Sequence, residues 1–579
     1  MTRSSLIIRN GTVVDGSGGA PFVADVGVKD GKIVEVGKIA WRADEEIDAE
    51  GLLVTPGFVD IHTHYDAQAL WSSHIDPSSW HGVTTVMFGN CGVGFAPCKP
   101  EQRDMLVALM EGVEDIPEVV LTEGLPWNWQ TFPQFLDRLG ERRLDMDVVM
   151  QVPHAALRVF VMGERGFARE PSTDDDRREM ARLTVEGIRA GALGFSTSRT
   201  IIHKTLKGEH TPTLGAAEEE LAVIGDGMRQ AGAGWMQVIT DFDDPVAEFH
   251  LLRRVAERSG VPMSLTLAQR EGSKAHHWRL LLGLIEQANQ DGVPIVAQIL
   301  GRQIGTNFGF ELTESPFSQR PSWKAIARLP FEQKLAILRQ PEFRARLLAE
   351  ETIGDVQKRR LNSWDRIFVL GDPPDYEPTV EDSIAGRAKR AGVSPAEYAY
   401  DLMLENGGKT LLYRPVTNYV DGNLDVCAEM MRHPNTVMGL GDGGAHVGAI
   451  CDAACTTHTI THWTRDRTRG PRMDLAWIIK RLTREPALAV GLNDRGVIAP
   501  GYKADLNVID YERLRLRPLE VVYDLPANGR RLIQKSDGYV ATIVSGVPTY
   551  RDGVATDALP GRLVRGAQQD ARTAAAAAE

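Results

Sequence analysis

Two histidines lie one residue apart at the end of an apolar run, in the stretch GFVDIHTHYD at residues 57–66. Side chains two positions apart in a β-strand point to the same side, so His62 and His64 share a face with Asp60. Two imidazoles on one face form a clamp for a divalent metal ion. Two histidines that only end a strand, without binding metal, would give the same pattern. The surrounding sequence must therefore decide between a metal clamp and two structural residues.

A metal clamp at a strand end requires a fold that gathers strand ends together. From LLVTPGFVDIHTH to NTVMGLGDG the chain alternates apolar strands with helical patterns, and eight such strands can be counted. Parallel strands covered by helices are apolar on both faces. Eight of them favour an α/β fold of the (β/α)8, TIM-like barrel type, in which functional groups collect at the carboxyl ends of the strands. An open doubly wound sheet is the alternative.

Both ends of the chain carry short β-rich runs separated by glycine turns. Each group of strands is too small to form a core alone, so we expect one small β-sandwich built from both chain ends. The predicted domains are residues 1–56 and 497–560 for the sandwich, and residues 57–496 for the barrel. A helical insertion at about 311–430 is expected to cover the barrel mouth, and residues 561–579 are expected to form a tail.

The composition excludes several classes of partner. The chain has 579 residues with a formal charge of -13, and its charges are spread along the sequence, so we expect no nucleic-acid partner. No stretch reaches the roughly 18 uninterrupted apolar residues of a membrane span, and no secretory signal is recognisable at the start. We therefore expect no membrane partner and a cytoplasmic location. Five cysteines at irregular spacing indicate no disulfide framework, although any of them could bind a metal.

Ordered motifs along nearly the whole chain resemble a known family. TPGFVDIHTHYD, which follows the N-terminal β-rich runs, is similar to the opening motif of the amidohydrolase superfamily. The resemblance narrows to its D-aminoacylase branch, the N-acyl-D-amino-acid deacylases, through HGVTTVMFGNCGVGFAP, LPWNWQTFPQFLDRL, GALGFSTS, MMRHPNTVMGLGDGGAH and GVIAPGYKADLNVIDYERL. These matches run from about residue 7 to residue 552. The resemblance implies a metal-dependent hydrolase of amide-like bonds, and a homo-oligomer.

The resemblance also implies roles for single residues. His62 and His64 match the HxH metal ligands, and Cys91 in GNCG matches the cysteine that supplies a metal-binding thiolate in this branch. Asp442 in GLGDGGAH matches the aspartate after the eighth strand, which in the family binds metal or moves the proton. We expect Asp442 to be both a metal ligand and the catalytic residue.

The sequence departs from the branch at two further ligand positions. The D-aminoacylases carry one histidine at the end of strand five and another at the end of strand six. Here Gln237 or Ile239 falls near the first position and Leu267 near the second. An amide is a poor zinc ligand compared with imidazole, and leucine has no lone pair to offer. The metal site of the branch is therefore incomplete.

Three explanations remain open. Other residues could replace the missing ligands, and the candidates are His203, Asp241, Asp243, Asp244, Gln269 and Glu271. Alternatively, one metal held by His62, His64 and Asp442, with or without Cys91, could suffice. Lastly, the site could have lost its metal and its activity. We favour a re-ligated or single-metal site, with one Zn²⁺ per chain rather than two. A protein that had lost its metal and its activity would not need the histidine pair, the cysteine and the aspartate together.

The predicted reaction is hydrolysis of a linear or cyclic amide bond in a small molecule such as an N-acyl-D-amino acid. A bound metal would activate water, and Asp442 would act first as base and then as acid. Candidates for substrate contacts are Arg199, His203, His154 and His446. A salt bridge is the alternative for Arg199. Two other functions remain open: a catalytically silent scaffold, and a metal enzyme of the same fold that performs deamination or carbon-carbon cleavage.

Overall fold

A computed structural model describes residues 5–571 of the chain. Its centre is a sheet of eight parallel strands in which each strand pairs with the next one along the barrel. The strands are β6 (Phe58–Asp60), β7 (Val83–Phe88), β8 (Asp147–Pro153), β9 (Gly194–Arg199), β10 (Trp235–Thr240), β11 (Met263–Thr266), β12 (Ile295–Ile299) and β15 (Thr436–Met438). These are the eight strands expected from the sequence, and the barrel prediction is confirmed.

The two outer strands of this sheet, β6 and β15, meet through the residues that follow them. The backbone N–H of Asp442 donates to the carbonyl of His62 at 3.0 Å, and the N–H of His64 donates to the carbonyl of Gly443 at 2.7 Å. We call residues 62–64 and 442–443 the seam. The seam nearly closes the sheet into a barrel, and it does so with the backbone of the residues expected to carry chemistry.

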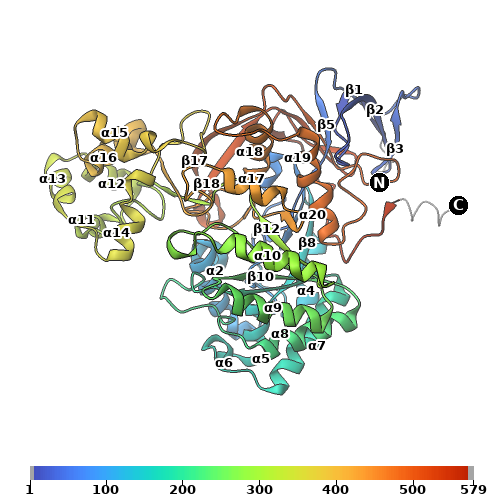
Figure 1. The fold of residues 1–579 in the computed structure, drawn as a ribbon, viewed down its shortest axis with the longest axis horizontal. Coiled ribbons are helices and arrows are strands. Elements are labelled where there is room, and N and C mark those ends of the chain that lie inside the picture. Colours follow the sequence, from blue (N-terminus) through green and yellow to red (C-terminus); the bar gives the residue numbers. More distant parts are fainter. Residues whose placement is uncertain (1–4, 572–579) are drawn as a thin grey trace.

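Helices pack around the outside of the barrel (Figure 1). Those between β8 and β12 include α5 (His154–Met162), α7 (Asp174–Ala190), α8 (Glu218–Ala231), α9 (Pro245–Ser259) and α10 (His277–Gln290). The local sequence explains their limits: Thr173 accepts a hydrogen bond from Asp176 at the start of α7, and Gly191 ends that helix with a φ of 121°. The strands β7 and β8 are buried along their whole length, as a sheet covered on both faces requires.

Strands from both chain ends form a second, nine-stranded sheet. They are β1 (Ser5–Val13), β2 (Phe22–Lys29), β3 (Lys32–Gly37), β4 (Glu45–Asp48), β5 (Leu53–Pro56), β16 (Leu506–Ile509), β19 (Tyr539–Val544), β20 (Val547–Arg551) and β21 (Val554–Ala555). The two ends join where β5 pairs with β16. Apolar residues such as Ile8, Val54 and Val508 share one core, which confirms that neither terminus forms this unit alone.

The helical insertion forms a lobe at one side of the molecule (Figure 1). Its helices are α11 (Pro321–Ile326), α12 (Phe331–Leu338), α13 (Pro341–Ala349), α14 (Asp355–Leu361), α15 (Ile384–Ala391) and α16 (Pro395–Gly408). They have a hydrophobic core of their own, and the hairpin of β13 (Gly305–Phe308) and β14 (Leu412–Pro415) connects them to the barrel. The helix α17 (Asp425–Arg432) falls inside the predicted insertion but packs on β12 and β15, because its apolar face belongs to the barrel core.

The segment predicted as a tail is partly ordered. Gly561 pairs with Leu144, and Leu563 pairs with Val148, so residues 561–571 run along the barrel. The rest of that segment and residues 1–4 lie outside the described residues. The domain boundaries stay a prediction. None of the helices in residues 5–571 is long and apolar enough to cross a lipid bilayer.

Candidate metal centre and active site

Donor groups from the first two barrel strands converge on one point. The Nε2 atom of His62 lies 3.2 Å from Sγ of Cys91, and one donor atom from each of His62, His64 and Cys91 lies within 4.8 Å of the others. All three side chains are buried. Cys91 follows β7 with a φ of 54°, in a turn that directs its thiol toward the histidines at the end of β6. The histidine pair and the cysteine, distant in the sequence, are thus brought together.

Asp442 reaches the same point from the other side of the seam. Its Oδ1 atom lies 3.5 Å from Nε2 of His62 and 3.8 Å from Nε2 of His64. The preceding residue must be glycine, because a Cβ at Gly441 would lie 1.9 Å from the carboxylate of Asp60. Asp60 therefore packs beneath the loop that carries Asp442, and the two carboxyl groups are held at fixed places.

Two residues that the sequence analysis missed orient the histidine rings. The side-chain oxygen of Gln298, on β12, lies 2.7 Å from Nδ1 of His62, and a carboxylate oxygen of Glu114 lies 3.1 Å from Nδ1 of His64. The amide oxygen of Gln298 accepts, so Nδ1 of His62 carries the proton and Nε2 of His62 presents its lone pair to the common point. This is the tautomer that a metal ligand requires.

The spacing of the donors fits one divalent ion held by His62, His64 and Cys91, with Asp442 beside it. A tetrahedral zinc ion, with bonds of about 2.0 Å to nitrogen and 2.3 Å to sulfur, separates its ligand atoms by roughly 3.3 to 3.7 Å. The separations between His62 and Cys91, His62 and Asp442, and His64 and Asp442 are 3.2, 3.5 and 3.8 Å. Two imidazoles, a thiol and a carboxylate are also the ligand types that zinc prefers.

The electrostatics of the cluster favour a cation. Burial raises the pKa of Asp442 to about 7, and burial together with the charge of Asp442 raises the pKa of Glu114 well above its usual range. Burial also raises the pKa of the Cys91 thiol and lowers that of His62 to about 4. Among the described residues, neither Asp442 nor Glu114 pairs with a lysine or arginine. A positive ion would relieve this unfavourable burial of acidic groups.

A cavity of about 250 Å³ opens from the cluster. His203 and His446, two of the expected substrate contacts, line it together with His62, His64, Cys91, Glu114 and Asp442. The rest of the wall is largely apolar and includes Ile202, Ile239, Phe242, Leu267, Trp278, Leu281, Ile304, Val416, Leu440 and Ile450. The hairpin that carries the helical lobe contributes to this wall through Ile304 and Val416 at its base. No described residue of α11–α16 lines the cavity, so cover of the barrel mouth by the insertion stays a prediction.

The structure places the other two expected substrate contacts, Arg199 and His154, away from the cavity lining. The guanidinium of Arg199 pairs with Glu248 at 2.5 Å, the salt bridge considered as its alternative. His154 is fully buried, with Nδ1 2.8 Å from Thr197 Oγ1 and Nε2 3.0 Å from a carboxylate oxygen of Glu220. Both side chains are used by partners within the protein, because the strand ends that carry them turn toward the surrounding helices.

The residues at the two missing ligand positions have other roles. The side-chain oxygen of Gln237 accepts a hydrogen bond from the backbone N–H of Cys91 at 2.9 Å. Leu267 is buried in the cavity wall. Gln237 thus positions the cysteine, and Leu267 contributes hydrocarbon where the resemblance predicts an imidazole.

Most of the replacement ligands considered above are engaged elsewhere. Asp241 accepts hydrogen bonds from Thr200 and Arg270. The remaining pairs are Asp243 with Lys274, Asp244 with the first turn of α9, Gln269 with Asp421, and Glu271 with Arg414. His203 and Asp241 are the two candidates that line the cavity; Asp241 is held by Thr200 and Arg270, and Nδ1 of His203 lies 2.9 Å from Ser198 Oγ. The geometry thus favours the single-metal explanation over a re-ligated second site.

The sequence contains a signal for Gln298 but none for Glu114, the two residues that the sequence analysis missed. Gln298 is a polar residue inside the apolar strand GVPIVAQIL, and a buried amide of this kind requires a partner. Glu114 is the last residue of α2 (Arg103–Glu114) and belongs to no motif. Only the packing of α2 against the barrel mouth reveals its contact with His64.

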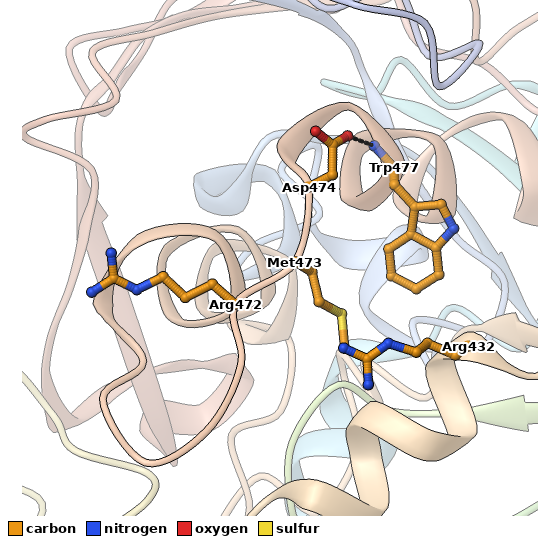
Figure 2. A pocket seen from close by; sticks show the side chains of 5 residues that line it. All are labelled: Arg432, Arg472, Met473, Asp474 and Trp477. Carbon is orange, nitrogen blue, oxygen red and sulfur yellow. Dashed lines mark hydrogen bonds between the residues drawn. The ribbon is translucent and has the colours of Figure 1, made fainter.

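A second hollow, of about 350 Å³, lies apart from the donor cluster and is shown in Figure 2. It is lined by Arg432, Arg472, Met473, Asp474 and Trp477. Asp474 caps the helix α19 (Leu475–Leu482) by accepting from the backbone of Trp477 at 2.9 Å. Its carboxylate is used structurally, and we assign this hollow no chemistry.

Comparisons with known proteins agree with this geometry. Residues 45–550 match the amidohydrolase family. An uncharacterized protein of Mycobacterium tuberculosis (strain ATCC 25618 / H37Rv) is 28% identical, over 95% of this chain and 92% of its own. The N-acyl-D-aspartate deacylase of Alcaligenes xylosoxydans xylosoxydans is 25% identical, over 88% of this chain and 86% of its own.

A solved structure shares the fold along nearly the whole chain. It is the N-acyl-D-glutamate deacylase of Bordetella bronchiseptica, crystallised with zinc and a phosphonate inhibitor. The likeness covers 97% of this chain and 100% of that one, with a TM-score of 0.64 and 20% sequence identity. The chain belongs to the amidohydrolase family, and its relatives and structural neighbours include N-acyl-D-amino-acid deacylases.

Proposed function

We propose that this protein hydrolyses the amide bond of a small N-acyl amino acid or a related linear or cyclic amide, using one divalent metal ion, which we take to be Zn²⁺. The observation that carries the proposal is that donor atoms of His62, His64 and Cys91 lie within 4.8 Å of one another at the mouth of the barrel, with Asp442 Oδ1 3.5 Å and 3.8 Å from the two histidine Nε2 atoms. The zinc found with the Bordetella deacylase supports the choice of metal.

His62, His64 and Cys91 would hold the ion, with Asp442 beside it. When bound, a divalent ion lowers the pKa of water from 15.7 toward about 7 and polarises the scissile carbonyl. Gln298 keeps the imidazole of His62 in the required tautomer, and the carboxyl group of Glu114 lies beside the imidazole of His64. The apolar wall excludes bulk water, which strengthens every charge interaction in the cavity.

Asp442 would move the proton. Its carboxylate accepts a proton from the attacking water and returns it to the leaving nitrogen, so that an amine departs rather than an amide anion. His203 and His446 line the cavity beside Asp442 and are the candidates for contacts with the substrate carbonyl. Expulsion of a neutral amine would complete the reaction.

The test combines metal content with amine release. Protein purified without added metal should contain about one zinc per chain, and it should release amine from some members of a panel of N-acyl-D-amino acids, cyclic imides and lactams. Removal of the metal with a chelator should abolish release, and added zinc should restore it. The proposal falls if zinc, iron and manganese are all absent and no amine is released.

The alternatives predict different results. A silent scaffold would contain no metal and release no amine, whereas a deaminase or carbon-carbon lyase would hold the metal and leave every amide intact. The cluster of His62, His64 and Cys91 beside Asp442 favours a metal enzyme over the scaffold. Burying these polar side chains without an ion would bring the protein no structural benefit. A cytoplasmic location and a homo-oligomer stay predictions, which fractionation and light scattering would test.

A further inference from the structure

The cavity beyond the donor cluster is walled by hydrocarbon. Leu267, which stands where the resemblance predicts a metal-binding histidine, packs in this wall near Trp278 and Leu281 on α10. Ile239 lies on the neighbouring strand and Ile304 on the hairpin of the helical lobe. A substrate group that extends into this space meets CH groups from several separate elements, so its burial would be favoured by the hydrophobic effect.

The two cations of the cavity are already neutralised. The guanidinium of Arg270 donates to the backbone and side-chain oxygens of Asp241, both at 3.0 Å, and the ammonium of Lys274 pairs with Asp243. Asp241 is further fixed by Thr200 Oγ1 at 2.7 Å. A carboxylate on the substrate side chain would have to share a cation that already pairs with an aspartate, so its burial is less favourable than that of a hydrocarbon group.

Apolar side chains continue from the cavity to the surface. Ile202 lines the cavity and is nevertheless 62% exposed. Leu206, in the same loop after β9, is 71% exposed. Large apolar residues at such exposure have a cost in water unless something covers them. A flexible hydrocarbon chain that enters past this loop would cover Ile202 without any rearrangement of the barrel.

We infer that the substrate carries a hydrocarbon group of several carbons beside the scissile amide, and that N-acyl derivatives of aspartate and glutamate are poor substrates. This inference rests on the proposed function, and it separates this chain from the two deacylases of acidic substrates to which it is similar. The hydrocarbon could belong to the acyl group or to the amine-side residue, since either would occupy the same apolar wall.

Binding measurements test the inference without turnover. The Asp442→Asn protein, loaded with zinc, would be titrated calorimetrically with two series: acetyl to octanoyl groups on D-alanine, and N-acetyl-D-alanine to N-acetyl-D-norleucine. In the series whose hydrocarbon group contacts the apolar wall, Kd should fall by about fourfold for each added methylene until the cavity is filled. N-acetyl-D-aspartate and N-acetyl-D-glutamate should bind at least tenfold more weakly than N-acetyl-D-norvaline. L-enantiomers, titrated in parallel, would report the stereochemistry.

Two neighbouring isoleucines provide matched variants. Ile202→Ser should weaken the dependence of Kd on chain length by at least threefold, because Ile202 lines the cavity. Ile201→Ser should leave it unchanged, because Ile201 is similarly exposed, at 53%, but does not line the cavity. Circular dichroism would show that both variants fold.

The outcomes separate this inference from the proposed function. If Kd does not depend on chain length, or if the acidic compounds bind best, the hydrocarbon inference is overturned while amide hydrolysis by the wild type can still stand. If chain length governs Kd but the zinc-loaded wild type hydrolyses none of these amides, the hydrocarbon pocket stands and the proposed reaction is overturned. If both isoleucine variants behave alike, Ile202 does not form part of the binding wall and the inference is overturned for this loop.

Discussion

The side-chain oxygen of Gln237 accepts a hydrogen bond from the backbone N–H of Cys91 at 2.9 Å. Gln237, near a strand end where the resemblance predicts a metal-binding histidine, thus holds the backbone of another donor residue. Together with Leu267 in the cavity wall, it leaves a donor set for one ion rather than two.

Restoring both histidines should create a second metal site. The Gln237→His and Leu267→His double variant should bind about two zinc ions per chain where the wild type binds about one, because both strand ends would again present imidazoles. Atomic emission after dialysis against dilute zinc measures the ratio. Leu267→Met is the control, since it keeps volume without adding imidazole. Two ions in the wild type would contradict the single-metal site.

Gln298 should govern metal affinity without binding the metal. Gln298→Leu removes the acceptor that fixes His62, so zinc affinity should fall by about 10- to 100-fold, and Gln298→Glu should recover it. Competition with a chromophoric chelator measures the dissociation constant. Gln151→Leu is the matched control, because Gln151 is equally buried but pairs with Asn90 and Trp235 instead. Equal losses in the two leucine variants would show a general packing effect.

Asp442 should matter for turnover more than for metal retention. Asp442→Asn keeps the shape of the side chain but cannot accept a proton, so kcat should fall by about three powers of ten or more, roughly 4 kcal/mol, while zinc stays near one per chain. Amine release under single-turnover conditions, with zinc analysis of the same sample, checks both. Asp244→Asn, at the start of α9, should change neither quantity. Near-normal turnover in Asp442→Asn would remove the assignment.

The buried Glu220 should make stability depend on pH. Burial by itself would raise its pKa, but hydrogen bonding and charge from His154 and the charge of Arg158 outweigh burial and lower the pKa to about 2, from an ordinary 4.5. A lowered folded-state pKa stabilises the protein above pH 4.5, and that stabilisation is lost as pH falls from 4.5 toward 2. Relative to Glu220→Gln, the wild type should be more stable by on the order of 3 kcal/mol at pH 7.

Urea denaturation of both proteins at pH 7, 5, 4 and 3 would measure this difference. The gap should be constant at pH 7 and 5 and should shrink at pH 4 and 3. Glu257→Gln serves as the control, because Glu257 forms an exposed pair with Arg253 and should change stability by no more than about 1 kcal/mol. A gap that stays constant down to pH 3 would show that Glu220 has no lowered pKa.

The barrel could be predicted from the sequence because the apolar runs correspond to the buried strands. Eight apolar runs separated by helices leave few alternatives to a closed parallel sheet, and the HxH pair identifies its own strand end. The meeting of Asp442 with His62 and His64 was predicted from the resemblance, and the structure brings them together.

Contacts between helices and strand ends could not be predicted from the sequence. Arg199 and His154 follow strands as functional residues do, but Glu248 on α9 and Glu220 on α8 lie within their reach. Glu114 reaches His64 only because α2 ends at the barrel mouth. Each of these contacts depends on how far and at what angle a helix packs, which periodicity does not specify.

The seam ties assembly of the site to the order in which the chain is made. His62, His64 and Cys91 leave the ribosome early, whereas the strand that brings Asp442 emerges only after the helical lobe has been synthesised. The bonds between His62 and Asp442 and between His64 and Gly443 form when that last strand docks. Under the proposed function, a nascent chain would bind zinc with its first donors but would lack the proton carrier, so hydrolysis would begin only when the barrel is complete.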